Sequence, residues 1–106
     1  MKTKELSVVI ITRDRKKELL ECLQSIFSQS RSPDEIIVVD NGSRQKVRNI
    51  HGIKLVRSET NLGGAGGRNL GLLHTTGKYI LFMDDDAVAD KDMLKELHKI
   101  ITKDSK

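Results

Sequence analysis

LSVVIITRDR, the sequence of residues 6–15, joins a short, β-branched and nearly continuous apolar run to four polar residues. An apolar run of this length without polar alternation predicts a strand that is buried on both faces. Strands of this kind are typical of parallel sheets, which helices cover on both sides. The polar residues at 12–15 then form a loop at the carboxyl end of this strand.

Three more apolar runs predict strands further along the chain, at residues 35–39, 53–56 and 79–83. Each is short and rich in β-branched or other apolar residues, as buried strands are. The run at 53–56 is the weakest of them, and we expect it to lie at an edge of the sheet.

Helices are predicted between and after these strands. Apolar residues at helical spacing indicate one helix over residues 16–28 and another from Asp90, a suitable N-cap, to Ile101. A glycine-rich loop at 61–69 should lead into a helix that runs to about Thr76 and stops at Gly77. The polar residues at 44–52 are ambiguous, and a short helix is one interpretation.

The alternation of strands and helices predicts a doubly wound α/β fold with a mainly parallel sheet in three layers. We expect a single domain over residues 1–106, because no linker, repeat or low-complexity segment interrupts the chain. Right-handed crossovers bring the carboxyl ends of the strands to one edge, where ligands bind in such folds. Polar clusters at 12–15, 40–43 and 84–86 should therefore lie together.

Asp84, Asp85 and Asp86 are the strongest candidate site, because three adjacent carboxylates have no use in a core. Mn²⁺ and Mg²⁺ take oxygen ligands, commonly one or two carboxylates together with substrate phosphates. Alternate residues at a strand end, here Asp84 and Asp86, can face one ligand together. A solvated turn is the alternative. An EF-hand is excluded, because its sixth and twelfth positions would be Ala89 and Lys95.

The glycine-rich segment NLGGAGGRN, residues 61–69, is the second candidate. Its glycines allow the backbone to approach either a ligand or a neighbouring sheet closely, and both uses stay open. A helix that starts here could attract an anion with its free N–H groups, and Arg68 could balance a diphosphate. The segment is not a P-loop, because no Gly-Lys-Ser/Thr follows it.

Asp40 ends the second predicted strand and precedes Asn41, Gly42 and Ser43, which are typical turn residues. Its carboxylate can accept hydrogen bonds from the backbone of that turn. It can equally accept a hydrogen bond from a base N–H or a ribose hydroxyl of a bound nucleotide. The residues alone leave these two alternatives open.

The composition of the chain narrows its partners. The net charge is +4, the basic residues are scattered among acidic ones, and aromatic residues are few, so we expect no nucleic-acid partner. A mildly basic face could still meet anionic lipid or a diphosphate. A single cysteine, Cys22, excludes an internal disulfide and indicates a reducing, cytoplasmic compartment. The apolar run at 6–11 is too short for a signal peptide or a membrane span.

Four blocks of the chain resemble, in order and spacing, the N-terminal part of family 2 glycosyltransferases. They are residues 7–15, 36–43, 61–69 and 79–86. The resemblance implies the Rossmann-like nucleotide-binding half of a GT-A fold. It also implies an inverting transferase that takes a sugar from a nucleotide-diphosphate-sugar and uses Mn²⁺ or Mg²⁺ at a D-x-D motif.

The resemblance assigns a role to each matching residue. Thr12 and its neighbours line the nucleoside pocket, Asp40 contacts the base, commonly uracil, and Arg68 lies near the nucleotide. Asp84 is expected near the ribose, and Asp86 together with Asp84 at the metal. The implied nucleotide-sugar-binding residues are Thr12, Arg13, Asp14, Arg15, Asp40, Asn41, Gly42, Asn61, Gly63, Gly64, Arg68, Asp84 and Asp85.

The chain departs from the family pattern in two respects. Ile11 and Arg13 stand where many members have proline and an aromatic residue, so base stacking is not predicted. The family places its catalytic base and acceptor site well beyond Ile101. We therefore assign no catalytic residue, and we expect a donor-binding domain that stops before those parts and has no transferase activity alone.

The resemblance also indicates substrates and partners. The run Asn61–Gly67 together with the acidic triplet is most similar to rhamnosyl- and galactofuranosyl-transferring members. A UDP- or dTDP-linked donor and a glycan or lipid-linked acceptor follow, and the full-length enzyme could associate peripherally with a membrane.

Two other functions compete with this interpretation. Residues 84–88 also fit the D-x-D-x-[T/V] motif of haloacid-dehalogenase-type phosphatases, although that motif should follow the first strand. A non-catalytic nucleotide-binding module of the same fold is the other alternative. Whichever holds, an apolar face left exposed on the domain would favour self-association.

Overall fold

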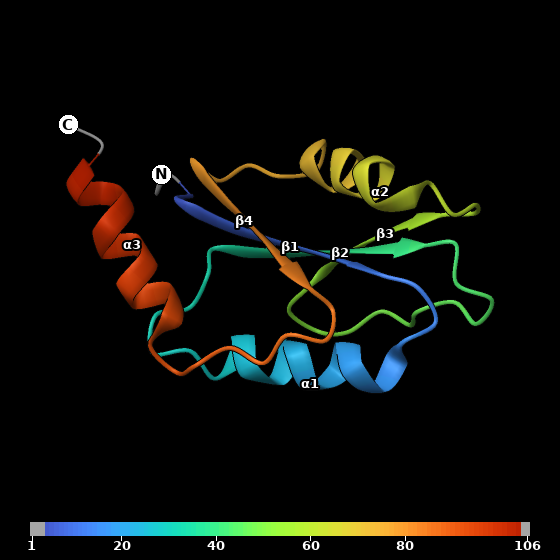
Figure 1. Ribbon diagram of the computed structural model, residues 1–106, viewed down its shortest axis with the longest axis horizontal. Helices are drawn as coiled ribbons and strands as arrows, with labels where there is room; N and C mark the ends of the chain where they lie inside the picture. Colours follow the sequence, from blue (N-terminus) through green and yellow to red (C-terminus); the bar gives the residue numbers. More distant parts are fainter. Residues whose placement is uncertain (1–3, 105–106) are drawn as a thin grey trace.

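The computed structural model describes residues 4–104 as a single sheet with helices packed around it (Figure 1). Its strands are β1 (Leu6–Thr12), β2 (Glu35–Asn41), β3 (Lys54–Ser58) and β4 (Tyr79–Asp84). Its helices are α1 (Lys16–Phe27), α2 (Gly63–Leu72) and α3 (Met93–Asp104). The predicted order of elements is therefore confirmed, apart from the short helix at 44–52.

The four strands are all parallel and lie in the order β3-β2-β1-β4. Central β1 pairs on both sides, and its Ile10 lies opposite Val38 of β2 and Met83 of β4. This position explains why the first strand is nearly continuously apolar, since both faces and both edges are covered. The edge position predicted for the third strand is confirmed.

The side chains of β1 alternate between two cores, one on each face of the sheet. Val8 and Ile10 pack in the core that α1 covers, whereas Val9 packs with Ile37 and Val39 on the opposite face. Figure 1 shows α1 below the sheet and α2 above it. The three-layer, doubly wound α/β prediction is thus confirmed.

Helix α1 forms because its apolar residues recur on one face. Leu19, Cys22, Leu23 and Ile26 are all buried, at the i, i+3, i+4, i+7 spacing of an amphipathic helix. Burying each of the larger side chains contributes about 1.5–3 kcal/mol. The helix begins directly after Arg15, so the loop at 12–15 is held between β1 and α1.

After β4 the chain runs back along α1 to the other end of the sheet (Figure 1). The Ala89 N–H donates to Ser25 Oγ at 2.9 Å, and Gln29 Nε2 donates to the Asp90 carbonyl at 2.6 Å. Helix α3 then closes that end by burying Leu94 completely against the α1 core.

Two expectations for α3 are corrected. Asp90 is not its N-cap, because α3 begins at Met93, and Asp90 Oδ2 instead accepts the N–H of Asp92 in the turn before it. Ile100, one of the apolar residues whose helical spacing predicts this helix, is 58% exposed and so does not belong to a buried face. Met93 and Leu94, in the first turn of α3, pack at the core.

Helix α2 also differs from the prediction, since it starts at Gly63 and ends at Leu72. Most of the expected glycine loop is therefore helical. Glycine has a poor helix propensity, but packing against the sheet compensates for it here. A Cβ on Gly67 would lie 2.9 Å from Ile11 Cγ2, and one on Gly71 would lie 2.6 Å from Val9 Cγ1.

Residues 44–52 form no helix, and side-chain hydrogen bonds explain why. Asp40 accepts the backbone N–H groups of Ser43 and Val47, and Asp14 accepts that of Arg44. Aspartates that bind the backbone in this way compete with helical hydrogen bonding. The segment is therefore an irregular loop.

Among residues 4–104, no helix is both long enough and apolar enough to cross a membrane. Several apolar side chains remain on the surface, including Leu73, Phe82 of β4, and Val88. Self-association through such a face stays a prediction.

We expect Gly71→Ala to destabilise the domain by about 1–3 kcal/mol, because the added methyl group overpacks the α2–sheet contact. Urea unfolding followed by circular dichroism measures this loss. Gly64→Ala is the matched control: its Cβ would meet nothing closer than 3.6 Å, the flexible end of Arg68. Equal stability of the two variants would contradict the close packing of α2.

Candidate functional site

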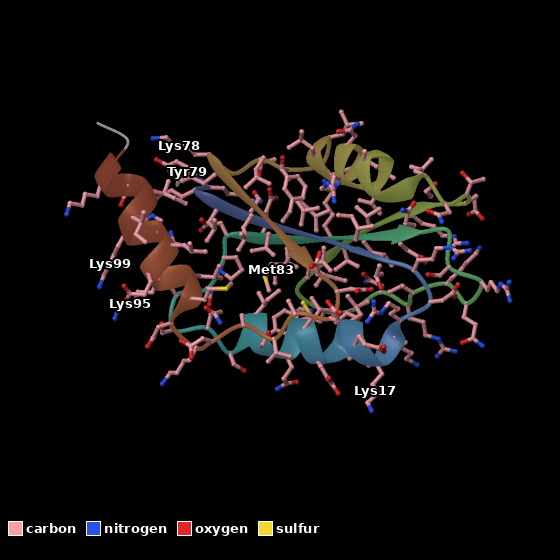
Figure 2. The ribbon with its side chains drawn as sticks, viewed as in Figure 1. Lys17, Lys78, Tyr79, Met83, Lys95 and Lys99 are labelled. Carbon is pink, nitrogen blue, oxygen red and sulfur yellow. The ribbon has the colours of Figure 1, made fainter. Side chains whose placement is uncertain are left out.

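A cavity of about 350 Å³ opens at the carboxyl edge of the sheet, between the start of α2 and the end of β4. It brings together Arg68 from α2, Arg15 from the first loop and the whole acidic triplet. Met83, labelled in Figure 2, lies on β4 directly before the triplet. The lining residues are Ile11, Arg15, Gly64, Arg68, Phe82, Met83, Asp84, Asp85 and Asp86.

Asp85, the middle carboxylate of the triplet, turns inward. Thr12 Oγ1 donates to Asp85 Oδ2 at 2.9 Å, and Arg15 Nη1 lies 3.7 Å from Asp85 Oδ1. Only 7% of Asp85 is exposed. This carboxylate therefore ties the end of β4 to the end of β1, and its contact with a nucleotide-sugar stays a prediction.

Asp84 and Asp86 are exposed on either side of Asp85. Asp86 Oδ2 lies 3.3 Å from Arg15 Nη2, so one guanidinium bridges two carboxylates of the triplet and offsets their repulsion. The Arg15–Asp86 pair is exposed and contributes little stability, so a ligand can displace it.

The acidic triplet can supply only part of the ligands of a hard cation, and a substrate would have to supply others. Among the described residues, no group of three or more His, Cys, Asp or Glu side chains is arranged to bind a metal ion. Mg²⁺ and related ions, however, often use one or two carboxylates and take their remaining ligands from phosphates and water. Asp84 and Asp86, exposed at one cavity, match that donor set.

Cys22 packs beneath the triplet. Its thiol donates to the Asp84 carbonyl oxygen at 3.5 Å, and the side chain is fully buried. Burial, and next the charges of Asp85, Asp86 and Asp84, raise the pKa of Cys22 to about 11. A thiol with so high a pKa is a poor nucleophile and serves as a small packing residue.

Arg68 is the cation that faces the triplet across the cavity. Its guanidinium lies over Gly64, one turn earlier in α2, where a Cβ would come within 3.6 Å of it. Within residues 4–104, Arg68 forms no ion pair, and it is exposed. It is therefore available to a negatively charged ligand.

Asp40 lies at the same edge but is fully enclosed. Its oxygens accept the N–H groups of Ser43 at 3.1 Å and Val47 at 2.9 Å, and Arg57 Nη1 at 2.7 Å. Burial by itself would raise the pKa of Asp40, but these three donors outweigh it and lower the pKa. The turn-holding alternative is what the structure shows, and contact with a base stays a prediction.

Asn41, Gly42, Asn61 and Gly63 fasten α2 to the end of β2. Asn41 accepts the Leu62 N–H at 2.9 Å and donates to the Gly63 carbonyl at 3.1 Å. Gly42 has a φ of 78°, and a Cβ there would lie 2.6 Å from the Asn61 nitrogen, so glycine is required. Asn61 Oδ1 in turn accepts the Gly63 N–H at 2.9 Å.

Asp14 and Arg13 lie in the loop after β1, away from the carboxylate cavity. Asp14 has a φ of 53° and donates its N–H to Ser43 Oγ at 2.9 Å, which joins this loop to the turn after β2. Arg13 is exposed and lines neither cavity. Asp14 instead borders a second, larger cavity on the α1 side of the sheet, whose wall also includes Thr12 and Arg15.

Three residues that shape the site were not anticipated from the sequence. Ile11 and Phe82 form the apolar wall of the carboxylate cavity, and Arg57 neutralises Asp40. Arg57 could have been found, because it lies in β3 of a parallel sheet and so reaches the same edge. The predicted strand ends two residues too early, at Val56, and so leaves Arg57 out.

The fold and this edge define an α/β nucleotide-binding domain of the GT-A type. A crystal structure of residues 1–349 of TarS from S. aureus, in complex with UDP-GlcNAc, matches with a TM-score of 0.80 and 33% identity. The match covers 93% of this chain and 31% of that one. The model of glycosyl transferase family 2 matches residues 7–106, and the chain belongs to that family.

Curated relatives are similar over most of this chain. Galactofuranosyltransferase GlfT1 of Mycolicibacterium smegmatis is 38% identical over 104 residues, which is 90% of this chain and 34% of GlfT1. Poly(ribitol-phosphate) beta-N-acetylglucosaminyltransferase TarS of Staphylococcus aureus is 33% identical over 102 residues, or 87% of this chain and 18% of TarS. The chain thus spans about a third or less of these relatives.

A mannosyltransferase from Pyrobaculum calidifontis, in complex with GDP-Man and Mn²⁺, has the same fold. It matches with a TM-score of 0.77 and 24% identity over 93% of this chain.

We expect Asp40→Asn to lower stability by about 2 kcal/mol at neutral pH, because the amide cannot accept from all three donors. The lowered pKa of Asp40 means that the unfolded chain takes up this proton more readily, so wild-type stability falls as the pH drops through the acidic range. Between about pH 6 and about pH 3, the Asp40→Asn variant should lose less stability than the wild type, as measured by urea unfolding.

Asp90→Asn is the control for this test, since that carboxylate is exposed and accepts one long hydrogen bond from Asp92. It should change stability by less than about 0.5 kcal/mol. If Asp40→Asn had the same stability as Asp90→Asn at every pH, Asp40 would not be a buried carboxylate that its three donors stabilise.

Proposed function

We propose that this chain is the donor-binding part of an inverting glycosyltransferase that uses a nucleoside-diphosphate sugar, with a UDP-linked sugar favoured. One observation supports this most directly. Arg68, which has no ion-pair partner among residues 4–104, and the acidic triplet line the same cavity at the carboxyl edge of the sheet. A cation and a metal-binding carboxylate pair on opposite walls suit a diphosphate between them.

On this proposal Asp86 and Asp84 hold Mn²⁺ or Mg²⁺, because both are exposed, whereas Asp85 is buried and accepts a hydrogen bond from Thr12. A bound divalent cation would stabilise the negative charge of the leaving nucleoside diphosphate. Arg15 Nη2 lies 3.3 Å from Asp86 Oδ2, and this exposed pair would open when Asp86 binds the cation.

Arg68 binds the diphosphate from the α2 side, and the apolar wall of Ile11 and Phe82 limits the water around it. Asp84 is assigned to the ribose by the family resemblance. Thr12 and Arg15 act through Asp85: they hold the inner carboxylate so that its two neighbours face outward. They are positioning residues in this account.

The transfer itself forms a bond between an acceptor hydroxyl and the anomeric carbon, while the bond to the diphosphate oxygen breaks. Attack from the face opposite the leaving group inverts the anomeric centre. The hydroxyl proton passes to a carboxylate base, which the family resemblance places after Ile101. The similarity to TarS, a poly(ribitol-phosphate) glycosyltransferase by name, favours a polymer as acceptor, and the similarity to GlfT1 favours galactofuranosyl transfer. Rhamnosyl transfer and a glycan or lipid-linked acceptor follow from the family resemblance.

The phosphatase alternative has no support. The acidic triplet follows β4, at the edge of the sheet, whereas the phosphatase motif should follow the first strand. A non-catalytic nucleotide-binding module would share the donor site, so the experiment below tests the site itself.

Calorimetric titration with UDP, with and without Mn²⁺, tests the donor site. We expect UDP to bind the chain in a metal-dependent manner. Asp86→Ala should weaken metal-dependent binding at least about tenfold, because it removes a proposed ligand.

Glu21→Ala is the matched control, because Glu21 is an exposed carboxylate on α1 that lines neither cavity. It should bind UDP as the unaltered chain does. The proposed metal site would be wrong if the folded protein bound UDP and neither Mn²⁺ nor Asp86→Ala changed the affinity.

A further inference from the structure

The fold gathers positive charge that looks scattered in the sequence. Residues 13–18 and 44–48 contain seven basic and two acidic residues, a net charge of +5, whereas the whole chain has a net charge of +4. These two segments lie at the start of α1 and in the loop between β2 and β3. The rest of the molecule is therefore close to neutral.

The two segments face each other across a cavity of about 720 Å³ on the α1 side of the sheet. We call this cavity the basic groove. The lining residues that carry its charge or its apolar surface are Lys16, Leu19, Leu20, Lys46, Val47 and Arg48. In Figure 1 the loop between β2 and β3 passes the α1 side of the sheet. At the far end of this loop, Gly52 lies against the Phe27 ring of α1, since a Cβ on Gly52 would be 3.3 Å from that ring.

The cations of the groove are not neutralised within the domain. Lys16, Lys46 and Arg48 are exposed and form no ion pair among residues 4–104. Of the two acidic residues nearby, Glu18 lies 3.7 Å from Arg15 and Asp14 accepts the Arg44 N–H. Lys17 points away from the sheet on the first turn of α1 (Figure 2) and does not line the groove.

Exposed apolar side chains accompany these charges. Leu20 is 44% exposed and Phe27 is 45% exposed, and they lie two turns apart on one face of α1. Leu20 lines the groove, and Phe27 meets the same loop through Gly52. A soluble polyanion would satisfy the cations but would leave these two side chains in water.

We propose that the basic groove and the adjoining α1 face form a docking surface for an anionic lipid membrane. Lys16, Lys46 and Arg48 would meet lipid phosphates, and Leu20 and Phe27 would enter the boundary between headgroups and acyl chains. The contact is peripheral, as no helix among residues 4–104 can cross a membrane.

This surface adjoins the donor site. Arg15 lines both cavities, and the groove wall also includes Thr12 and Asp14, which the family resemblance assigns to the nucleotide. The groove cations Lys16, Lys46 and Arg48 do not line the cavity that holds Arg68 and the triplet. A docked membrane would therefore lie next to the donor cavity without filling it. Loss of docking and loss of UDP binding can be measured separately.

Sedimentation with vesicles of phosphatidylglycerol and phosphatidylcholine tests the proposal, with pure phosphatidylcholine vesicles as the reference. The triple variant Lys16→Gln, Lys46→Gln, Arg48→Gln should bind the anionic vesicles roughly 100-fold more weakly, at about fivefold per cation. The triple variant Lys95→Gln, Lys99→Gln, Lys103→Gln removes the same charge from exposed positions on α3 and should lose less than about fivefold.

A second variant distinguishes docking on a lipid membrane from binding of a soluble polyanion. Leu20→Asn should weaken vesicle binding by about tenfold and leave binding to inorganic polyphosphate unchanged. Thermal unfolding and UDP titration of each variant confirm that the domain is intact. The proposal is overturned if anionic vesicles do not bind, if both triple variants lose equally, or if Leu20→Asn has no effect on vesicle binding.

Discussion

The contact between the Thr12 hydroxyl and the Asp85 carboxylate governs the geometry of the carboxyl edge. It joins residues 73 positions apart in the chain and connects the end of central β1 to the end of edge strand β4. Because Asp85 is satisfied from inside, by Thr12 and Arg15, its neighbours Asp84 and Asp86 face the cavity. Three adjacent carboxylates can coexist there because one guanidinium bridges two of them.

The opposite wall of the cavity depends on how closely α2 packs on the sheet. Gly67 and Gly71 let the helix backbone approach the sheet closely, and Asn41 holds the start of the helix to the end of β2. This close approach places Arg68 above the edge at which the strands end. The same glycines that look like a ligand-binding loop in the sequence therefore position the cation that we assign to the diphosphate.

The order of elements along the chain and the site cluster could be predicted from sequence because buried parallel strands are continuous apolar runs and end in polar residues. Two features could not. The enclosure of Asp40 depends on Arg57, which only the pairing of β3 with β2 brings near. The basic groove depends on residues 44–48 remaining an irregular loop beside α1, which side-chain bonds from Asp14 and Asp40 enforce. Both depend on contacts between segments distant in sequence, which periodicity does not encode.

The central claim is that a nucleoside diphosphate and a divalent cation meet between Arg68 and the acidic triplet. Amide NMR spectra of the chain with substoichiometric Mn²⁺, recorded with and without UDP, test it most directly, since the ion broadens the signals of nearby amides. We predict UDP-dependent broadening centred on residues 84–87 and extending to Gly64 and Arg68. Broadening centred elsewhere, for example on Asp90 and Asp92, or broadening that UDP does not alter, would contradict the account.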